Sequence, residues 1–70
     1  MSRGIVKWFD DAKGFGIITS DDGGEELFAH FKSIHGDGFE TLREGQKVEF
    51  QIKQGREGLH ADFIRPVLEG

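Results

Sequence analysis

The chain has 70 residues, a formal net charge of −4 and no cysteine. This length leaves room for one small domain, residues 1–70, and the lack of cysteine excludes disulfides and thiolate metal sites. No apolar run is long enough for a signal peptide or a membrane span, so we expect a cytoplasmic protein that makes no membrane contact.

The acidic residues are concentrated in one short segment. Residues 21–26 carry a charge of −4, whereas residues 1–20 and 27–35 carry +1 each. The net acidity argues against duplex DNA as a ligand, because proteins hold duplexes mainly through many phosphate contacts. A neutral or slightly basic aromatic face can still bind single strands, since base stacking needs few neutralised phosphates.

The first half of the chain predicts three short strands. Residues 4–10 and 15–19 are rich in β-branched and aromatic side chains, and a polar break of hairpin length separates them. A turn of acidic residues and glycines leads to a third strand at residues 27–30. We therefore expect an antiparallel meander of three strands.

The second half begins with a long segment that has no sustained period. Residues 32–45 are predicted to form a loop that can hold one helical turn near Ser33. Beyond it, Val48, Phe50 and Ile52 alternate with polar residues, which is typical of a half-buried strand. We expect these three apolar side chains to face the core.

A fifth strand is predicted at residues 59–65. A short Gly-containing connection precedes it, and Pro66, which cannot donate a ladder hydrogen bond, ends it. By its place in this strand, Phe63 is predicted to be a structural residue of the core. Five short strands and no long helical pattern predict an all-β fold, a small antiparallel barrel that encloses a core and hides its edges.

An aromatic stretch at residues 7–31 is the main functional signal. Gly14 and Gly16 flank Phe15 and leave the backbone open to close approach, so this strand is expected to present Phe15. In the next strand, Phe28 and His30 alternate onto one face. Two neighbouring aromatic faces beside lysines indicate a stacking surface for single-stranded nucleic acid.

Three spaced motifs in this stretch resemble the bacterial cold-shock proteins: Lys7-Trp8-Phe9, Lys13-Gly14-Phe15-Gly16 and Phe28-Ala29-His30-Phe31. Residues 36–39, 42–46 and 48–50 also fall in the family's order, so the resemblance covers nearly the whole chain. It implies a five-stranded OB-type barrel that binds single-stranded RNA and DNA with modest sequence preference. It also implies an RNA chaperone, which holds strands unpaired, and a role in the regulation of transcription or translation during a stress response.

The candidate nucleic-acid-binding residues combine the aromatic pattern with this resemblance. They are Lys7, Trp8, Phe9, Lys13, Phe15, Ile17, Phe28, His30, Phe31, Phe39, Arg56 and His60. Phe9 has a second expected role, because its side chain can also half-plug the barrel. We predict no catalytic residue, metal ligand, cofactor or small-molecule substrate.

Three positions depart from the family's usual pattern, and each touches the predicted site. Ile17 stands in place of an aromatic residue, Asp10 in place of asparagine and Leu59 in place of proline. The chain also resembles the stationary-phase subtype of this family at residues 23–26, 29–31, 60–61 and 66–67. Members of that subtype are associated with dimers and with inhibition of replication. The sequence therefore leaves open whether the protein is a monomer or a weak homodimer.

Two other classes of function, an enzyme and a peptide-binding barrel, have less support in the sequence than nucleic-acid binding. An enzyme would need a nucleophile with a base, a carboxylate pair in a cleft, or metal ligands, and a barrel of this size offers little cleft. A small barrel that binds a proline-rich peptide on the same rings is the alternative, since such grooves are also lined by aromatic residues. The lysines that flank the aromatic motifs favour nucleic acid.

Overall fold

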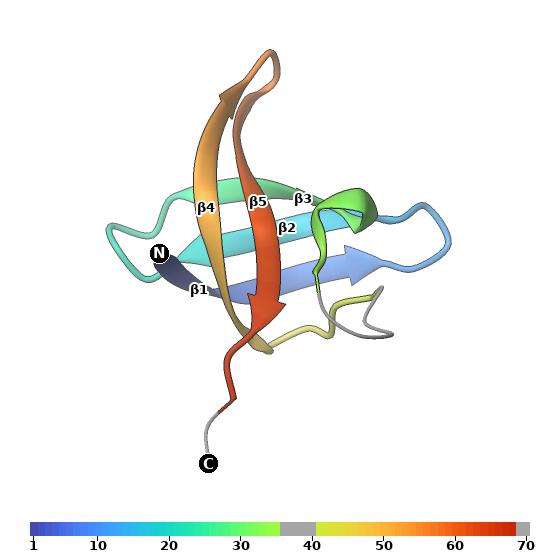
Figure 1. Ribbon diagram of the computed structural model, residues 1–70. Coiled ribbons are helices and arrows are strands. Elements are labelled where there is room, and N and C mark those ends of the chain that lie inside the picture. Colours follow the sequence, from blue (N-terminus) through green and yellow to red (C-terminus); the bar gives the residue numbers. More distant parts are fainter. Residues whose placement is uncertain (36–40, 69–70) are drawn as a thin grey trace.

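The computed structural model describes residues 1–35 and 41–68 (Figure 1). The elements are β1 (Ser2–Asp10), β2 (Phe15–Ser20), β3 (Glu26–His30), the 3-10 turn η1 (Phe31–Ser33), β4 (Lys47–Gly55) and β5 (Gly58–Pro66). All five predicted strands are present, and η1 is the helical turn expected near Ser33. No helix in the described ranges is long and apolar enough to cross a membrane.

The strands close into a barrel in the order β1-β2-β3-β5-β4, which confirms the all-β, OB-type architecture. In Figure 1 the β4–β5 hairpin crosses the β1–β2–β3 meander at a steep angle. Four of the five pairings are antiparallel, whereas β3 and β5 meet in parallel at Phe28 and His60. This junction brings β5 and η1 beside the outer face of β3.

Strict alternation of side chains in β2 and β3 separates the core from the outer surface. Ile18, Leu27 and Ala29 are fully buried, while the residues between them face outward. The rest of the buried apolar core consists of Val6, Leu42, Val48, Phe50, Ala61 and Ile64. The predicted face assignment of the second and third strands is therefore confirmed.

Ile52 does not join the core, contrary to the prediction from the alternation in β4. Its side chain is 40% exposed, although Val48 and Phe50 on the same face of the strand are buried. The pairing of β1 with β4 ends at Ser2 and Phe50. Ile52 lies beyond this pairing and therefore lacks the neighbouring strand that covers Val48 and Phe50.

Phe63 is also exposed, and its assignment to the core was wrong. Glu49 pairs with Arg65 and Gln51 with Asp62, so β5 carries one residue more than β4 between these pairs. Such a β-bulge interrupts the alternation of side chains. Ala61 and Ile64 therefore both face the core, and the side chain of Phe63 remains 39% exposed.

Candidate nucleic-acid interface

Three aromatic rings from three neighbouring strands form a continuous row on the outer surface of the meander. The ring of Phe15 lies 5.9 Å from that of Trp8 and 5.8 Å from that of Phe28, and both contacts are edge-to-face. This geometry is favourable because the positive edge of one ring meets the negative face of the next. Trp8 is 41% exposed and Phe28 37% exposed. We call Trp8, Phe15 and Phe28 the ring row.

Two glycines determine how closely β1, β2 and η1 approach one another around this row. A Cβ atom on Gly16 would lie 2.2 Å from the carbonyl oxygen of Trp8, so only glycine fits there. Gly14 has a φ of +77°, and a Cβ atom on it would lie 2.7 Å from the ring of Phe31. The expectation that the glycines permit close approach is thus confirmed at both positions.

Ile17 lies inside the ring row. It is in register with Trp8 on β1 and with Phe28 on β3, and it shares the outer face of β2 with Phe15. Its side chain is half-buried between these neighbours. The position that lacks an aromatic residue is therefore central to the surface.

His30 and Phe31 continue the aromatic surface beyond β3. Their ring centroids are 4.6 Å apart. Phe31 is the first residue of η1, and its side chain is exposed. The Nδ1 atom of His30 accepts a hydrogen bond of 3.2 Å from the backbone N–H of Lys32. Because an accepting Nδ1 requires the proton on Nε2 in a neutral imidazole, Nε2–H is a donor for a ligand.

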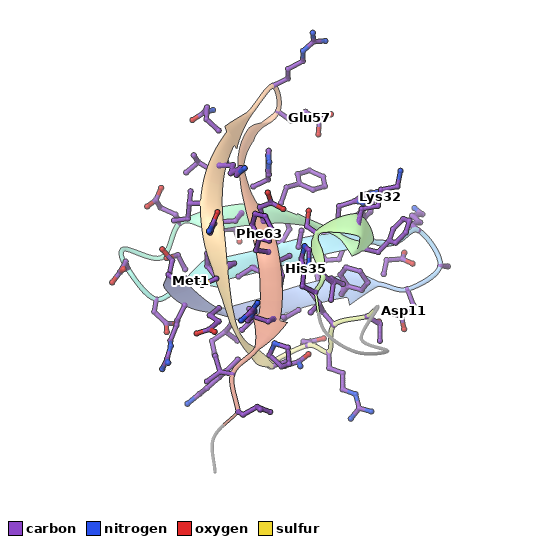
Figure 2. The ribbon with its side chains drawn as sticks, in the orientation of Figure 1. Met1, Asp11, Lys32, His35, Glu57 and Phe63 are labelled. Carbon is purple, nitrogen blue, oxygen red and sulfur yellow. The ribbon has the colours of Figure 1, made fainter. Side chains whose placement is uncertain are left out.

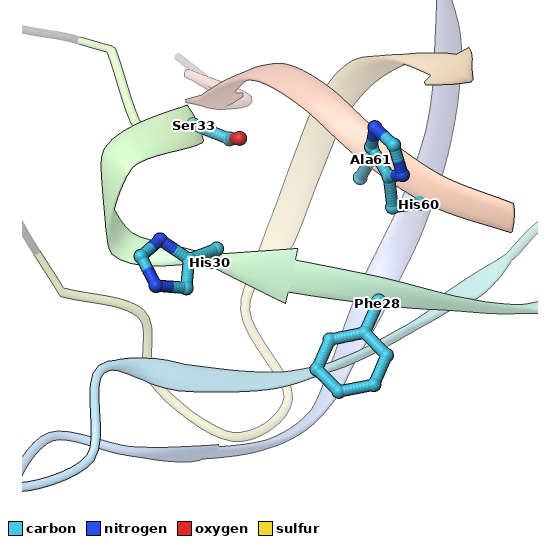
Figure 3. Close-up of a pocket in the computed structure, with 5 residues that line it drawn as sticks. All are labelled: Phe28, His30, Ser33, His60 and Ala61. Carbon is cyan, nitrogen blue, oxygen red and sulfur yellow. The ribbon is translucent and has the colours of Figure 1, made fainter. Parts of the chain in front are cut away.

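A first hollow of about 250 Å³ adjoins one end of the ring row. In Figure 3, Phe28 and His30 line it from β3, His60 and Ala61 from β5, and Ser33 from η1. The position of His60 supports its selection as a candidate. Ser33 and Ala61 were not predicted, because only the parallel junction of β3 with β5 brings them beside Phe28.

A second hollow of about 270 Å³ lies beside Phe31. It is lined by Phe9, Asp11, Ala12, Lys13, Gly14, Phe31 and Thr41. The hydroxyl of Thr41 donates a hydrogen bond to the carboxylate of Asp11, which ties the β1–β2 turn to the segment before β4. Phe9 also packs against the core, so its ring has both of the environments expected from the sequence. No pattern in the sequence indicated Thr41.

The predicted cations differ in their surroundings. Lys13 lines the second hollow, whereas the ammonium group of Lys7 forms an ion pair with Glu26. Arg56 is exposed at the tip of the β4–β5 hairpin, next to Glu57, and lines neither hollow (Figure 2). Phe39 lies outside the described residues. Only Lys13 thus combines a position beside the rings with freedom from a described ion pair.

Asp10, which stands where the family usually has asparagine, organises the turn that carries Lys13. Its carboxylate accepts hydrogen bonds from the backbone N–H groups of Ala12 at 3.0 Å and Lys13 at 3.1 Å. Both bonds need only an acceptor oxygen, which aspartate and asparagine share. Within the part of the chain that the structure describes, no group of three or more His, Cys, Asp or Glu residues could hold a metal ion.

Comparison with known proteins adds an independent line of argument. Residues 2–67 match the family model of the "'Cold-shock' DNA-binding domain". The chain is 57% identical over 67 residues to the cold shock-like protein CspA of Stigmatella aurantiaca. These aligned residues make up 96% of this chain and 98% of the relative. It is 52% identical over 67 residues to the cold shock-like protein CspD of Escherichia coli, with 96% and 90% covered.

A third relative, the cold shock-like protein CspG of Shewanella violacea, is 60% identical over 60 residues, or 86% of each chain. The family match spans the strands that carry the ring row and both hollows. The chain belongs to the cold-shock domain family, whose members are nucleic-acid-binding proteins and not enzymes.

Proposed function

We propose that this protein binds single-stranded RNA and DNA by stacking unpaired bases on the ring row and acts as an RNA chaperone. The observation that carries the proposal is the arrangement of Trp8, Phe15 and Phe28, which form one row from three strands, with Phe15 half-buried between the exposed rings of Trp8 and Phe28. Every base has a π-face that such rings can stack upon, but only when the base is free of its partner.

The charges near the row support single strands over duplexes as ligands. The net charge of the chain is −4, and Lys7 already pairs with Glu26. A duplex ligand would have to be held through many phosphate contacts, which this surface does not supply. Stacking on unpaired bases, supported by a few cations such as Lys13, matches the residues present.

Low sequence specificity follows from the same chemistry. Ring faces accept all four bases, and the polar groups beside the row are few: the imidazoles of His30 and His60 and the hydroxyl of Ser33 in the first hollow. A chaperone that binds many RNA sequences needs this tolerance. Holding bases on the rings would keep them from pairing, which is the chaperone action that we propose.

The fluorescence of Trp8, the only tryptophan, provides the test of binding. We expect quenching on titration with oligo(dT) and with oligo(U), and little change with duplex DNA. Quenching by a duplex as strong as by single strands would contradict the proposal. A proline-rich peptide is the third titrant, and quenching by the peptide alone would assign the rings to peptide binding.

The chaperone step needs its own measurement. An RNA hairpin labelled with a fluorophore and a quencher should open on addition of the wild-type protein. Phe28→Ala is the matched variant, because it shortens the ring row by one ring. If the protein binds single strands but never shifts the hairpin equilibrium, it is a binding protein without chaperone action. A role in transcription, translation or replication, the cytoplasmic location and the oligomeric state stay predictions from the sequence.

A further inference from the structure

Phe63 has a backbone conformation that aromatic residues rarely adopt. Its φ is +50°, and among the described residues it is the only one other than glycine with a positive φ. Bulges of this kind usually place glycine at such a position, because a Cβ atom is crowded there. A strained conformation at a large exposed side chain is a reason to look for a function of that side chain.

The ring of Phe63 is part of a small aromatic and charged cluster on the outer side of β5. It stacks on the imidazole of His35 with a centroid distance of 4.9 Å and an interplanar angle of 28°. The Nζ atom of Lys53 lies 5.8 Å from the ring centroid. Figure 2 shows Phe63 and His35 side by side in front of β5. Both are exposed, so the pair is open to a ligand.

Backbone contacts hold the two rings in place. The backbone N–H of His35 donates to the carbonyl oxygen of Ile64 at 2.7 Å, and Ile34 forms a parallel bridge with Ile64. Ile34 and His35 are therefore held against β5 next to the stack. A ligand would meet a preformed pair of rings and would not have to order them.

The carboxylate of Asp62 organises the charged side of the cluster. Desolvation raises the pKa of Asp62, but hydrogen bonds from the backbone N–H of Phe63 and from Lys53 and Ser33 outweigh it and hold the pKa below its usual value. Lys53 lies 3.4 Å from this carboxylate. Among the described residues, the carboxylate beside these rings is thus already paired with a cation.

The cluster is continuous with the first hollow. Ser33 lines that hollow beside Phe28, and its hydroxyl is among the groups that lower the pKa of Asp62, next to Phe63. Lys32 and Arg65, which are also exposed, add positive charge next to Ser33 and two residues beyond Phe63. A strand that leaves the ring row through the first hollow would reach rings and cations again.

We propose that Phe63 and His35 form a second stacking position for single-stranded nucleic acid, reached by a strand that already occupies the ring row and passes Ser33. The inference rests on the proposed function of the ring row and extends its footprint. Rings beside cations are the combination that unpaired bases and their phosphates require. The competing explanation is structural, namely that Phe63 only fastens the segment after η1 to β5.

Two lengths of oligo(dT) separate these explanations. A strand of about 6 nucleotides covers the ring row alone, and one of about 12 nucleotides extends further, within the range of sites on such barrels. The test variant is Phe63→Asn, because asparagine tolerates a positive φ and removes the ring. Ile52→Asn is the matched control, since Ile52 is an exposed apolar residue of the same hairpin and belongs to neither site.

We expect Phe63→Asn to weaken binding of the longer strand about fivefold or more and to change binding of the shorter strand less than about twofold. His35→Ala should act in the same direction. The melting temperature of Phe63→Asn should stay the same or rise, because the substitution relieves the backbone. Ile52→Asn should leave both affinities as in the wild type.

Three results would overturn the inference. In the first, the affinities of Phe63→Asn match the wild type at both lengths. In the second, both affinities fall alike, which makes Phe63 a support of the ring row. In the third, the melting temperature of Phe63→Asn drops and the dependence of its affinity on strand length matches the wild type. Phe63 would then serve only to hold the segment after η1 against β5. If the wild type binds neither strand, the proposed function itself fails, and this outcome is distinct from the other three.

Discussion

The ammonium group of Lys7 on β1 lies 2.5 Å from the carboxylate of Glu26 on β3, so the side chains reach across β2 on the outer surface of the meander. Both side chains are more than half exposed. An exposed ion pair of this kind contributes about 0 to 1 kcal/mol to stability. We expect a more direct effect on binding, because Glu26 would compete with the phosphates of a bound strand for Lys7.

Removing the charge of Glu26 should therefore strengthen nucleic-acid binding. We expect Glu26→Gln to bind oligo(dT) up to about fivefold more tightly at low salt, because an exposed pair of up to about 1 kcal/mol no longer has to be broken. Its free energy of unfolding should fall by at most about 1 kcal/mol. Fluorescence titration and thermal unfolding measure the two effects.

Asp22→Asn is the control for this variant. It removes the same charge from the turn that precedes β3, four residues before Glu26, and the structure shows no ion pair of Asp22 within residues 1–35 and 41–68. The control should tighten binding less than Glu26→Gln does. Equal gains from both variants would mean that the general charge of the turn matters and that the pair with Lys7 does not.

The salt dependence of the wild type is a second prediction. Few cations lie beside the ring row, so we expect about two to four phosphate contacts and a slope of log K against log salt near −0.7 for each contact. Binding should survive moderate salt. Titrations with oligo(dT) at several salt concentrations give the slope. A value of about −6 or steeper would show that phosphate contacts dominate and that stacking is secondary.

Phe28→Ala tests whether the rings serve binding more than folding. Stacking of a base on an aromatic residue contributes about 1 to 3 kcal/mol, so the substitution should weaken binding about tenfold. Phe28 is 37% exposed and makes one edge-to-face contact with Phe15. Its removal should therefore cost about 1 kcal/mol of stability.

Phe50→Ala provides the comparison for Phe28→Ala. Phe50 is fully buried, and truncation of such a ring costs about 3 to 5 kcal/mol. Denaturant unfolding should therefore separate the two variants clearly. If Phe28→Ala unfolds as readily as Phe50→Ala and its folded fraction binds oligo(dT) normally, Phe28 is a core residue and not part of the binding surface.

The sequence predicted the face of each residue wherever alternation runs without interruption. In β2 and β3, Leu27 and Ala29 are buried while Phe15, Ile17 and Phe28 face outward, as the period of two requires. These two strands carry four of the twelve candidate residues, namely Phe15, Ile17, Phe28 and His30. The outward faces of Phe15 and Phe28 were therefore predictable from local pattern, whereas Trp8 lies on β1 at a shift of register, and the contacts between the rings were not predictable.

The remaining features depend on how distant segments meet. One extra residue in β5 turns Phe63 outward, and nothing in the local sequence marks that bulge with a glycine. Ile52 follows the alternation of β4 but lies past the end of the barrel. Ser33 and Ala61 join the first hollow only through the parallel junction of β3 and β5. A period of two contains no information about any of these.

Ile17 offers the most specific test of the ring row, because it lies between Trp8 and Phe28 and has no π-surface of its own. A phenylalanine there would add a stacking contribution of up to about 1 kcal/mol, or about fivefold in affinity. The barrel should hardly change in stability, since the side chain lies on the outer face of β2, opposite the buried Ile18. Fluorescence titrations of wild type and Ile17→Phe with the same oligo(dT), together with thermal unfolding of both, measure these effects.

Ile18→Phe is the control on the other face of the same strand. Ile18 is fully buried, so a larger ring there should overpack the core and cost about 1 to 3 kcal/mol of stability. The two substitutions are chemically identical and differ only in the face of β2 on which they fall. Tighter binding at residue 17 and lost stability at residue 18 would confirm the face assignment. If Ile17→Phe instead leaves the affinity unchanged and clearly lowers the melting temperature, residue 17 packs as a core residue and the ring row is interrupted there.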